Sequence, residues 1–307
     1  MSVMRIAIIG MGSMGPGMAA RLARGGHEVR AMDLAPAAME RAQAMLPMIA
    51  GALDGLGVAD EGGAIAFHPT LPDAVDGAQL VIENVPEKVD VKAQLYASLD
   101  PLVGPDVIVA TDTSGIPITK LQAHISHPER FVGMHWSNPP HIIPMIEVIA
   151  GERTAPETVR AMQGLIRGLG LLPVTLKRDL PGFVENRVLY ALLRECVDLV
   201  EQGVVDAEDL DTCVTWGIGY KLSVVGPMRL LDMAGLDIYE SVASFLNAEL
   251  CKRVDVSPMV TSKTGEGRLG MKTGAGLFDY TEAELASLPR ERGAKLVAVR
   301  RALEGKA

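Results

Sequence analysis

The chain lacks an excess of positive charge, and this absence limits the partners that it can bind. Its 307 residues include 29 lysines and arginines against 38 aspartates and glutamates, so the formal net charge is −9 at pH 7. Nucleic-acid binding requires a basic surface that neutralises phosphates, so we expect no nucleic-acid partner. Disorder is excluded as well, because 48% of the residues are hydrophobic and can fill a buried core.

Long apolar runs and paired cysteine motifs are also missing. The longest stretch without a charged residue, 131–146, contains histidine, asparagine and three prolines, which do not suit a membrane span. No charged segment followed by an apolar one stands at the N-terminus, so we expect no signal peptide. The three cysteines, Cys196, Cys213 and Cys251, lack CxxC spacing. Together these absences indicate a reduced, cytoplasmic protein without a membrane segment.

Short apolar runs alternate with helical segments in the first part of the chain. Strands are expected at 5–10, 28–33, 80–85, 107–111, 131–135, 145–149 and 172–176, and helices at 16–24, 88–99 and 155–169. Nearly continuous apolar strands with helices between them indicate a parallel sheet that is covered on both faces. After residue 179 the strand patterns end and long helical patterns begin. We therefore predict an α/β domain over residues 1–178, with a doubly wound sheet, and an all-helical domain over residues 179–307.

A glycine motif lies between the first expected strand and the first expected helix. Gly10-Met11-Gly12-Ser13-Met14-Gly15 fits G-x-G-x-x-G, in which the glycines permit a tight turn and let a pyrophosphate approach the backbone. The following helix, which begins at Pro16, would supply N–H donors. Asp33 ends the second strand, where an acid accepts hydrogen bonds from ribose hydroxyls and repels the extra phosphate of NADP. The pattern predicts NAD as the cofactor.

His135 and Glu147 are the main candidates for catalysis. His135 ends an expected strand, and the prolines that follow fold the chain back into the strand that carries Glu147. A carboxylate in such apolar surroundings needs a partner, because an unpaired buried charge costs several kcal/mol. The carboxylate would orient the imidazole and raise its basicity, so that His135 can take a proton from a substrate hydroxyl. His141 is the rival base, but its place beyond two prolines indicates a loop role.

Two further polar residues are expected near this pair. Ser114 follows the strand at 107–111, at the carboxyl edge where open α/β sheets bind ligands, although it can also cap a nearby helix. Asn186 lies near the start of the first long helix, on the same face as Tyr190 and Leu193. A polar amide on an apolar helix face is either a satisfied core group or a ligand contact, and the pattern leaves both open.

The order of several motifs resembles the 3-hydroxyacyl-CoA dehydrogenase family over residues 4–280. These motifs are IIGMGSMG, VIENVPEKVDVK, TDTSG, GMHWSNPP, IEVI, DLPGFVENR and KTGAGLFDY. The resemblance implies a Rossmann-type NAD-binding domain, a helical domain that forms a homodimer, and an active site between the domains. It also implies that His135 and Glu147 form the catalytic pair, and that Ser114 and Asn186 contact the substrate oxygen. Further NAD contacts are implied at Glu87, Lys92, Asn138 and Lys272.

The chain departs from the family where CoA would be held. Members that use acyl-CoA usually carry a lysine-bearing helical hairpin after the second strand. Here residues 34–70 have no lysine and one arginine, and they are expected to form a short Gly/Ala-rich connection. Cations are needed to hold the phosphates of CoA, so this region suits a smaller substrate. Lys221 follows the helical-domain motif WGIGY, where it would anchor a substrate carboxylate or remain an ordinary surface lysine.

Segments such as HWSNPPHIIPMIEVIAGE and WGIGYK resemble one branch of the family, which oxidises a pyridine-carboxylate aldehyde in pyridoxine breakdown. A hydrated aldehyde presents the same H–C–O–H unit as a secondary alcohol, so an alcohol-dehydrogenase site can oxidise it to a carboxylate. Three alternatives remain: a short-chain 3-hydroxyacyl-CoA dehydrogenase, for instance for 3-hydroxybutyryl-CoA; a dehydrogenase of a free hydroxy acid; and a non-catalytic NAD-binding protein. No metal is expected.

Overall fold

A computed structural model describes residues 3–306, and the chain forms two compact units. Unit 1 extends to Asn186 and also includes Leu296–Arg300, whereas unit 2 consists of Arg187–Lys295 and the residues after Arg300. Unit 1 therefore runs past residue 178, where we placed the domain boundary. The reason is a turn beyond that point that bonds back to unit 1: the Gly182 N–H donates to the Gly115 carbonyl at 3.1 Å.

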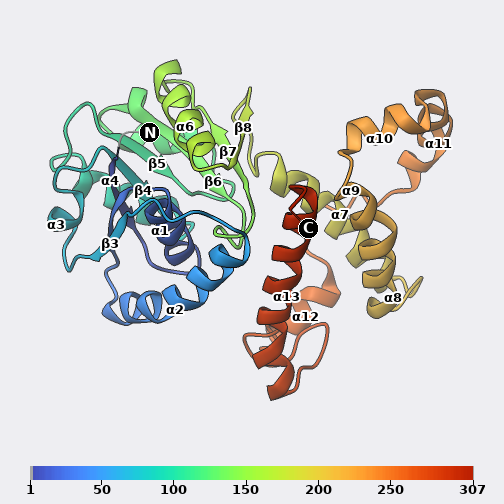
Figure 1. The fold of residues 1–307 in the computed structure, drawn as a ribbon. Helices are drawn as coiled ribbons and strands as arrows, with labels where there is room; N and C mark the ends of the chain where they lie inside the picture. The colour runs from blue at the N-terminus through green and yellow to red at the C-terminus, as the bar shows by residue number, and fades with distance from the viewer. Residues whose placement is uncertain (1–2, 307) are drawn as a thin grey trace. The chain divides into compact units, whose positions relative to one another are not determined.

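An eight-stranded sheet forms the centre of unit 1 (Figure 1). Its strands lie in the order β3-β2-β1-β4-β5-β6-β7-β8, and neighbours are parallel except for the antiparallel pair β6 and β7. The strands are β1 (Arg5–Ile9), β2 (Glu28–Met32), β3 (Ala64–Phe67), β4 (Leu80–Glu83), β5 (Ile108–Thr111), β6 (Phe131–Trp136), β7 (Met145–Ile149) and β8 (Leu172–Leu176).

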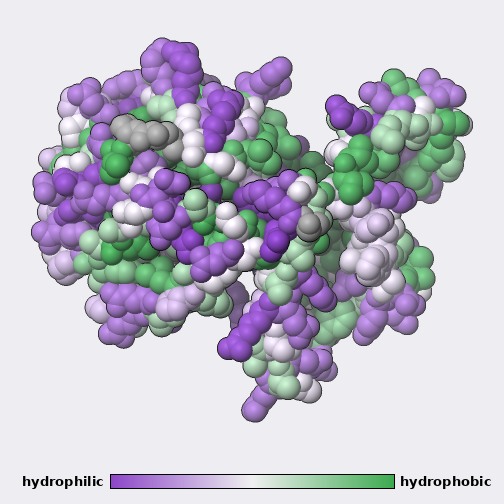
Figure 2. Space-filling view, viewed as in Figure 1, coloured by the Kyte–Doolittle hydropathy of each residue, from purple (hydrophilic) through white to green (hydrophobic). Residues whose placement is uncertain are grey.

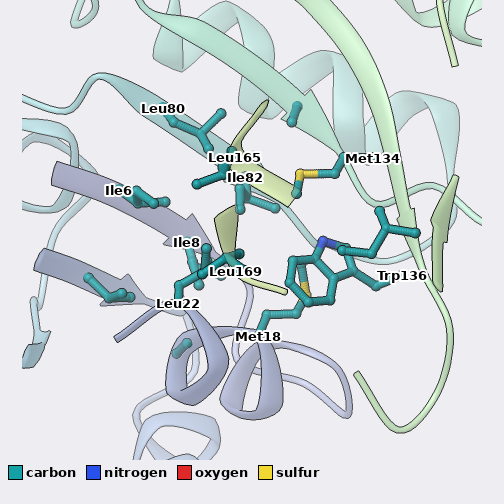
Figure 3. Packing of buried hydrophobic residues seen from close by; sticks show 14 of the residues in the cluster. Ile6, Ile8, Met18, Leu22, Leu80, Ile82, Met134, Trp136, Leu165 and Leu169 are labelled. Carbon is teal, nitrogen blue, oxygen red and sulfur yellow. The ribbon is translucent and has the colours of Figure 1, made fainter. Parts of the chain in front are cut away.

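Helices cover both faces of this sheet. They are α1 (Gly15–Arg24), α2 (Pro36–Gly55), α3 (Leu71–Val75), α4 (Val89–Leu99), α5 (Ile118–Leu121) and α6 (Pro156–Gly168), with 3-10 turns at Gln122–His124 and Pro128–Arg130. Successive side chains of a strand point to opposite faces. Accordingly Ile6 and Ile8 pack with α1 and α6 (Figure 3), while Ala7 and Ile9 pack with α3, α4 and α5. The predicted doubly wound sheet is confirmed.

The prediction of a short connection over residues 34–70 is wrong. A 20-residue helix, α2, begins at Pro36, and β3 then adds a strand at the sheet edge. Alanine is the strongest helix former, and proline is well tolerated at the first helical position. The buried side chains of α2 recur at helical spacing, so that one face of the helix packs inward: Ala38, Ala42, Ile49 and Leu53.

Unit 2 consists of helices joined by loops. They are α7 (Glu185–Glu201), which begins in unit 1, α8 (Ala207–Thr212), a π-helix (Cys213–Gly219), α9 (Tyr220–Leu222), α10 (Pro227–Ala234), α11 (Leu236–Glu249), α12 (Pro258–Gly265) and α13 (Glu282–Leu303). None of the helices from α7 to α12 contains a buried residue, and Figure 2 shows hydrophobic side chains at the surface over α10 and α11. Within residues 3–306, no helix has the length and apolar character needed to cross a membrane.

Candidate active site

The glycine motif forms the turn between β1 and α1, and two of its glycines cannot be replaced. Gly10 has a φ of +109°, and a Cβ there would lie 2.3 Å from the Asn84 carbonyl oxygen. A Cβ on Gly15 would lie 2.3 Å from the Gly10 carbonyl oxygen. A Cβ on Gly12, in contrast, would meet no atom within 4 Å, so its backbone is open to a ligand. This arrangement fits the pyrophosphate of a dinucleotide.

Asp33 lies at the end of β2 beside this turn, and its carboxylate organises the backbone there. One oxygen accepts a hydrogen bond from the Met11 N–H at 2.7 Å, and the other accepts one from the Ala35 N–H at 2.8 Å. Asp33 is half-buried, so the carboxylate keeps an accessible side. Because each carboxylate oxygen can accept more than one hydrogen bond, the position suits the ribose hydroxyls that we predict it binds.

His135 and Glu147 meet through the antiparallel register of β6 and β7. The register pairs the two residues directly, and His135 Nδ1 lies 2.8 Å from Glu147 Oε2. Both side chains are buried. An ionised carboxylate can only accept, so Nδ1 carries the proton and Nε2 remains available as a base. The other carboxylate oxygen, Oε1, accepts hydrogen bonds from the N–H groups of Val184 at 2.9 Å and Glu185 at 3.1 Å.

These contacts shift both pKa values toward an ion pair. Burial alone would lower the pKa of His135, but the hydrogen bond to Glu147 and the charges of Asp112 and Glu185 outweigh burial and raise it. Burial would likewise raise the pKa of Glu147. The hydrogen bonds from His135 and from two backbone N–H groups reverse this effect and lower it. The geometry therefore favours a charged carboxylate beside an imidazole of increased basicity.

A strained turn covers the imidazole. Phe183 is buried and has a φ of +53°, which is uncommon for a bulky residue. Its ring centroid lies 5.7 Å from that of His135, with the two planes tilted by 52°. The turn also delivers the next two N–H groups to Glu147. Strain of this kind persists only where surrounding contacts hold it, and here it serves to fix the His–Glu pair.

Ser114 is held by hydrogen bonds to its backbone N–H and to its backbone carbonyl. Glu87 Oε1 accepts the N–H groups of Ser114 at 2.9 Å and Gly115 at 3.1 Å, while the Asn186 side-chain amide donates to the Ser114 carbonyl at 2.7 Å. Ser114 itself is exposed, and α5 begins only at Ile118 with Pro117 as its N-cap residue, so Ser114 is not that cap. The amide of Asn186 thus contributes one hydrogen bond that positions the serine.

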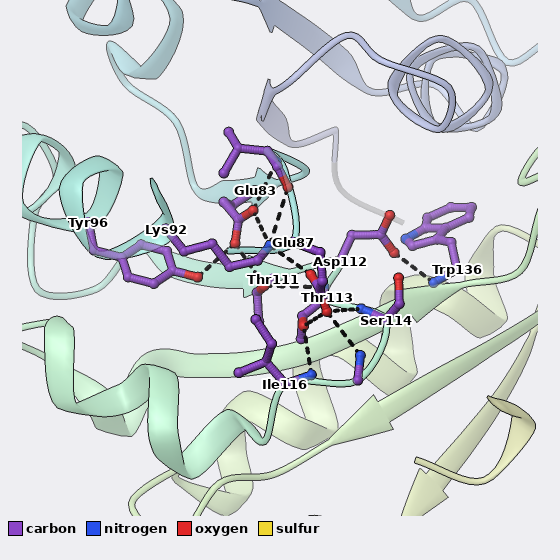
Figure 4. A network of polar contacts seen from close by, with 12 residues as sticks. Glu83, Glu87, Lys92, Tyr96, Thr111, Asp112, Thr113, Ser114, Ile116 and Trp136 are labelled. Carbon is purple, nitrogen blue, oxygen red and sulfur yellow. Dashed lines mark hydrogen bonds and ion pairs between the residues drawn. The ribbon is translucent and has the colours of Figure 1, made fainter. Parts of the chain in front are cut away.

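The network behind this serine contains a residue that sequence reasoning missed (Figure 4). Glu83 is fully buried, and its carboxylate bonds to Lys92 Nζ at 2.6 Å, Tyr96 Oη at 2.7 Å and Thr111 Oγ1 at 2.8 Å. Lys92 Nζ also lies 3.5 Å from a Glu87 carboxylate oxygen. Lys92, predicted as an NAD contact, is therefore buried and engaged by acids. Glu83 was recoverable, because it is a carboxylate in an apolar strand, as Glu147 is.

Asp112, which the sequence analysis also missed, lies directly after β5. Its Oδ1 accepts the Trp136 N–H at 2.8 Å (Figure 4). Burial raises the pKa of Asp112 to about 7, although the hydrogen bond from Trp136 and the charge of His135 oppose this rise. No pattern in the chain marks this loop residue as buried, because its burial depends on the packing of β6.

The remaining predicted residues lie in the loop between β6 and β7 or in unit 2. Asn138 is exposed in the loop that follows β6. Lys221, on α9, and Lys272, in the loop between α12 and α13, belong to unit 2 and are exposed. His141 is buried, and burial lowers its pKa. A Cβ on Gly17 would lie 2.8 Å from its Nδ1, so His141 packs against α1 as a loop residue.

Three side chains of the cluster are close enough to share a metal ion. His135, Glu147 and Glu185 each offer a ligand atom, and these atoms lie within 4.8 Å of one another. Both oxygens of Glu147, however, already accept hydrogen bonds, and Glu185 Oε2 accepts one from the Ser137 hydroxyl. We therefore interpret the group as a hydrogen-bonded network that controls protons.

The chain matches two family models, one for each part. Residues 5–180 match the NAD binding domain of 3-hydroxyacyl-CoA dehydrogenase, and residues 182–280 match the C-terminal domain of the same family. The chain belongs to the 3-hydroxyacyl-CoA dehydrogenase family. The residues that match the NAD binding domain include the glycine motif and Asp33 described above. The predicted fold class, the NAD cofactor and the assignment as an NAD-dependent dehydrogenase are confirmed.

Similar proteins cover nearly the whole chain. The 5-formyl-3-hydroxy-2-methylpyridine 4-carboxylate 5-dehydrogenase of Mesorhizobium japonicum is 66% identical over 307 residues, which are 99% of each chain. A crystal structure of a dehydrogenase for the corresponding acid, described as an NAD+ dependent dismutase, is 65% identical with a TM-score of 0.97, covering 99% of this chain and 100% of that one. The (S)-3-hydroxybutyryl-CoA dehydrogenase of Ralstonia eutropha is 31% identical with a TM-score of 0.73, covering 92% and 100%.

Proposed function

We propose that the chain oxidises 5-formyl-3-hydroxy-2-methylpyridine 4-carboxylate to the 4,5-dicarboxylate with NAD. The observation that carries the proposal is the buried His135–Glu147 pair, with Nδ1 and Oε2 2.8 Å apart, in a chain that is 66% identical to a dehydrogenase of this name. Supporting it, residues 34–70 contain no lysine to hold the phosphates of a CoA thioester.

The reaction begins with the hydrated aldehyde. His135 Nε2 removes one hydroxyl proton as the C–H bond breaks, so the imidazole becomes an imidazolium and the carbon becomes that of a carboxylic acid. The glycine turn at residues 10–15 would hold NAD, which would supply the hydride acceptor. Glu147 holds the ring and stabilises its positive charge. Ser114 and Asn186 position the reacting oxygen. In the reverse direction the imidazolium gives its proton to an aldehyde oxygen while the aldehyde carbon takes the hydride from NADH, which yields an alcohol and permits dismutation.

A substrate comparison tests this function. Purified protein with NAD is given the pyridine aldehyde, (S)-3-hydroxybutyryl-CoA and a free 3-hydroxy acid, and NADH is followed by absorbance. We expect kcat/KM for the aldehyde to exceed the other two by at least about tenfold, because a discrimination of roughly 1.4 kcal/mol is modest for a site with charged groups. A higher value for the CoA thioester would replace the proposal with the hydroxyacyl-CoA alternative. Absence of NADH and of acid and alcohol products with every substrate would revive the non-catalytic alternative, since dismutation of the aldehyde consumes the NADH that it forms.

We infer further that the chain forms a homodimer through unit 2. Large apolar side chains are exposed there, and monomeric proteins rarely expose so many: Tyr190, Trp216, Met228, Met233 and Phe245. A second copy related by two-fold symmetry would cover the same surface on both chains. The three free cysteines agree with a cytoplasmic location.

Sedimentation at several concentrations tests the dimer. We expect dimers for the native chain and weakened association for Phe245→Asp, because a charge would replace an aromatic side chain in the interface. Met48→Asp on α2, an exposed apolar position of unit 1, is the matched control and should leave association unchanged. A native chain that sediments as a monomer at all concentrations contradicts the inference.

A further inference from the structure

A second carboxylate stands beside the His135–Glu147 pair. Glu185 is the first residue of α7, and a ligand atom of its side chain lies within 4.8 Å of ligand atoms on both partners. Its own backbone N–H donates to Glu147 Oε1 at 3.1 Å. The strained turn at Phe183 therefore positions this carboxylate together with the pair, and the mechanism described above gives it no role.

The side chain of Glu185 is fixed by a hydrogen bond from the residue that directly follows β6, the strand that carries the base. The hydroxyl of Ser137 donates to Glu185 Oε2. Ser137 is buried and lies two residues after His135, so the bond holds the carboxylate of the half-buried Glu185 near the imidazole. A negative charge at this place interacts with His135 through surroundings of low polarity, where charges interact more strongly than in water.

We propose that Glu185 is a positioning residue that keeps His135 protonated between the oxidising and the reducing half-reaction. This inference rests on the proposed function. In the first half-reaction His135 gains a proton from the hydrated aldehyde while the hydride leaves its carbon. In the second, the same proton passes to the oxygen of a new aldehyde while the hydride returns to carbon. A stabilised imidazolium loses fewer protons to solvent in between, so acid and alcohol form in matched amounts.

Other groups also face the imidazole, and they act differently. Glu147 on β7 holds Nδ1 directly, and Asp112, after β5, interacts with His135 electrostatically. Since burial raises the pKa of Asp112 to about 7, this carboxyl is largely uncharged below neutral pH and supports the imidazolium less there. Phe183, from the turn before α7, presents an uncharged ring. Removal of the Glu185 charge should therefore be visible even with Asp112 and Glu147 in place.

The test is a direct titration of His135 in Glu185→Gln. Histidine labelled with 13C at Cε1 gives one NMR signal for each of the six histidines, and the signal that His135→Asn lacks belongs to His135. In Glu185→Gln we expect the pKa of His135 to fall by about one pH unit, because an opposite charge within this range has been removed. The acid limb of the oxidation rate should move to lower pH by the same amount, and less alcohol should form for each acid.

Two further variants keep the outcome interpretable. Ser137→Ala keeps the charge of Glu185 but removes the hydrogen bond that holds its carboxylate in place. We therefore expect a smaller fall of the His135 pKa. Glu157→Gln removes an exposed carboxylate on α6 and should leave the titration unchanged. An unshifted His135 signal in both Glu185→Gln and Ser137→Ala overturns the inference. Full activity of His135→Asn would instead overturn the proposed function, so the two failures are distinguishable.

Discussion

The two units of the chain differ in how they bury apolar surface. In unit 1, all residues of β4 and β6 are buried, and helices cover the sheet on both faces. In unit 2, helices α8 to α12 contain no buried residue, and Trp216 and Phe245 are exposed. Unit 1 thus carries a hydrophobic core of its own, whereas unit 2 obtains its stability from cover that we propose a second copy provides.

The same division separates two kinds of chemistry. His135 and Glu147 stand on neighbouring strands, whose rigid backbones maintain a short hydrogen bond. Lys221 and Lys272 stand on a short helix and a loop, where exposed lysines attract charged ligands without fixed geometry. We propose that unit 1 carries out proton transfer and that the exposed lysines of unit 2 attract charged groups. Paired variants, one in each unit, are therefore the sharpest tests.

The largest effect is expected from the catalytic pair of variants. His135→Ala should lower kcat by ~10²–10⁴-fold, because it removes the base, while NAD still binds. Lys221→Ala in unit 2 should mainly raise KM, because it removes the attraction for a substrate carboxylate and leaves the proton-transfer step unchanged. Steady-state kinetics and NAD titration by fluorescence measure both. Near-normal turnover in His135→Ala would contradict the proposal that proton transfer takes place in unit 1.

Stability offers the second comparison. Ile82→Ala in the core of unit 1 should cost ~2–5 kcal/mol, because it leaves a cavity at a fully buried position. Phe245→Ala should change the stability of unit 1 by no more than about 0.5 kcal/mol, as exposed positions usually do.

Urea unfolding measures these changes unit by unit. The chain has two tryptophans, Trp136 in unit 1 and Trp216 in unit 2, so Trp216→Phe leaves a fluorescence signal for unit 1 alone. Equal losses from Ile82→Ala and Phe245→Ala in this background would mean that the two units do not differ as described.

Cofactor selection gives a third and smaller contrast. Asp33→Ala should weaken NAD binding and reduce the preference for NAD over NADP by roughly tenfold, about 1.4 kcal/mol, because the repulsion of the extra phosphate is lost. Lys272→Ala should raise KM for NAD without increasing relative use of NADP. The two KM values for each variant are the measurement. An unchanged NAD:NADP ratio in Asp33→Ala counts against its role.

The smallest effect is a pH dependence of stability that originates in unit 1. The pKa of His135 is raised in the folded chain, so its contribution is fully present below the unfolded pKa and is lost as pH rises through the folded one. The pKa of Glu147 is lowered, so its contribution is lost as pH falls through the folded value. As the pH rises above the ordinary histidine pKa of 6.5, the Tm should fall more for the native chain than for His135→Asn. Parallel Tm curves would contradict the proposed ion pair.

Strand patterns predict the parts of the site that depend on local register. His135 and Glu147 stand in apolar strands that reverse at prolines, and the observed register pairs them directly. Reading the same signal at Glu83 would have located the buried acid that holds Lys92. Asp112 and Glu185 lie in a loop and at a helix start. Their contacts come from segments distant in sequence, which no local pattern describes.

Composition was less informative than helix propensity for residues 34–70. Glycine and alanine there suggested a short connection, yet Pro36 stands at the first turn of α2 and the alanines sustain the helix. The segment nevertheless contains no lysine. The argument against binding of the CoA phosphates therefore depends on the lack of positive charge, and the presence of α2 does not weaken it. Unit 2 was predictable as helical, whereas its exposed apolar surface becomes visible only in three dimensions.

The return of Leu296–Arg300 to unit 1 has a consequence for synthesis of the protein. Arg300 is buried there and donates to the Ile142 carbonyl at 2.7 Å, in the loop between the two catalytic strands. At roughly 5–20 residues per second, a ribosome spends about 5–20 s on the intervening helices before it delivers this piece. Unit 1, whose synthesis begins first, is therefore completed last. A chain released before Arg300 is added lacks the hydrogen bond that holds the loop between β6 and β7.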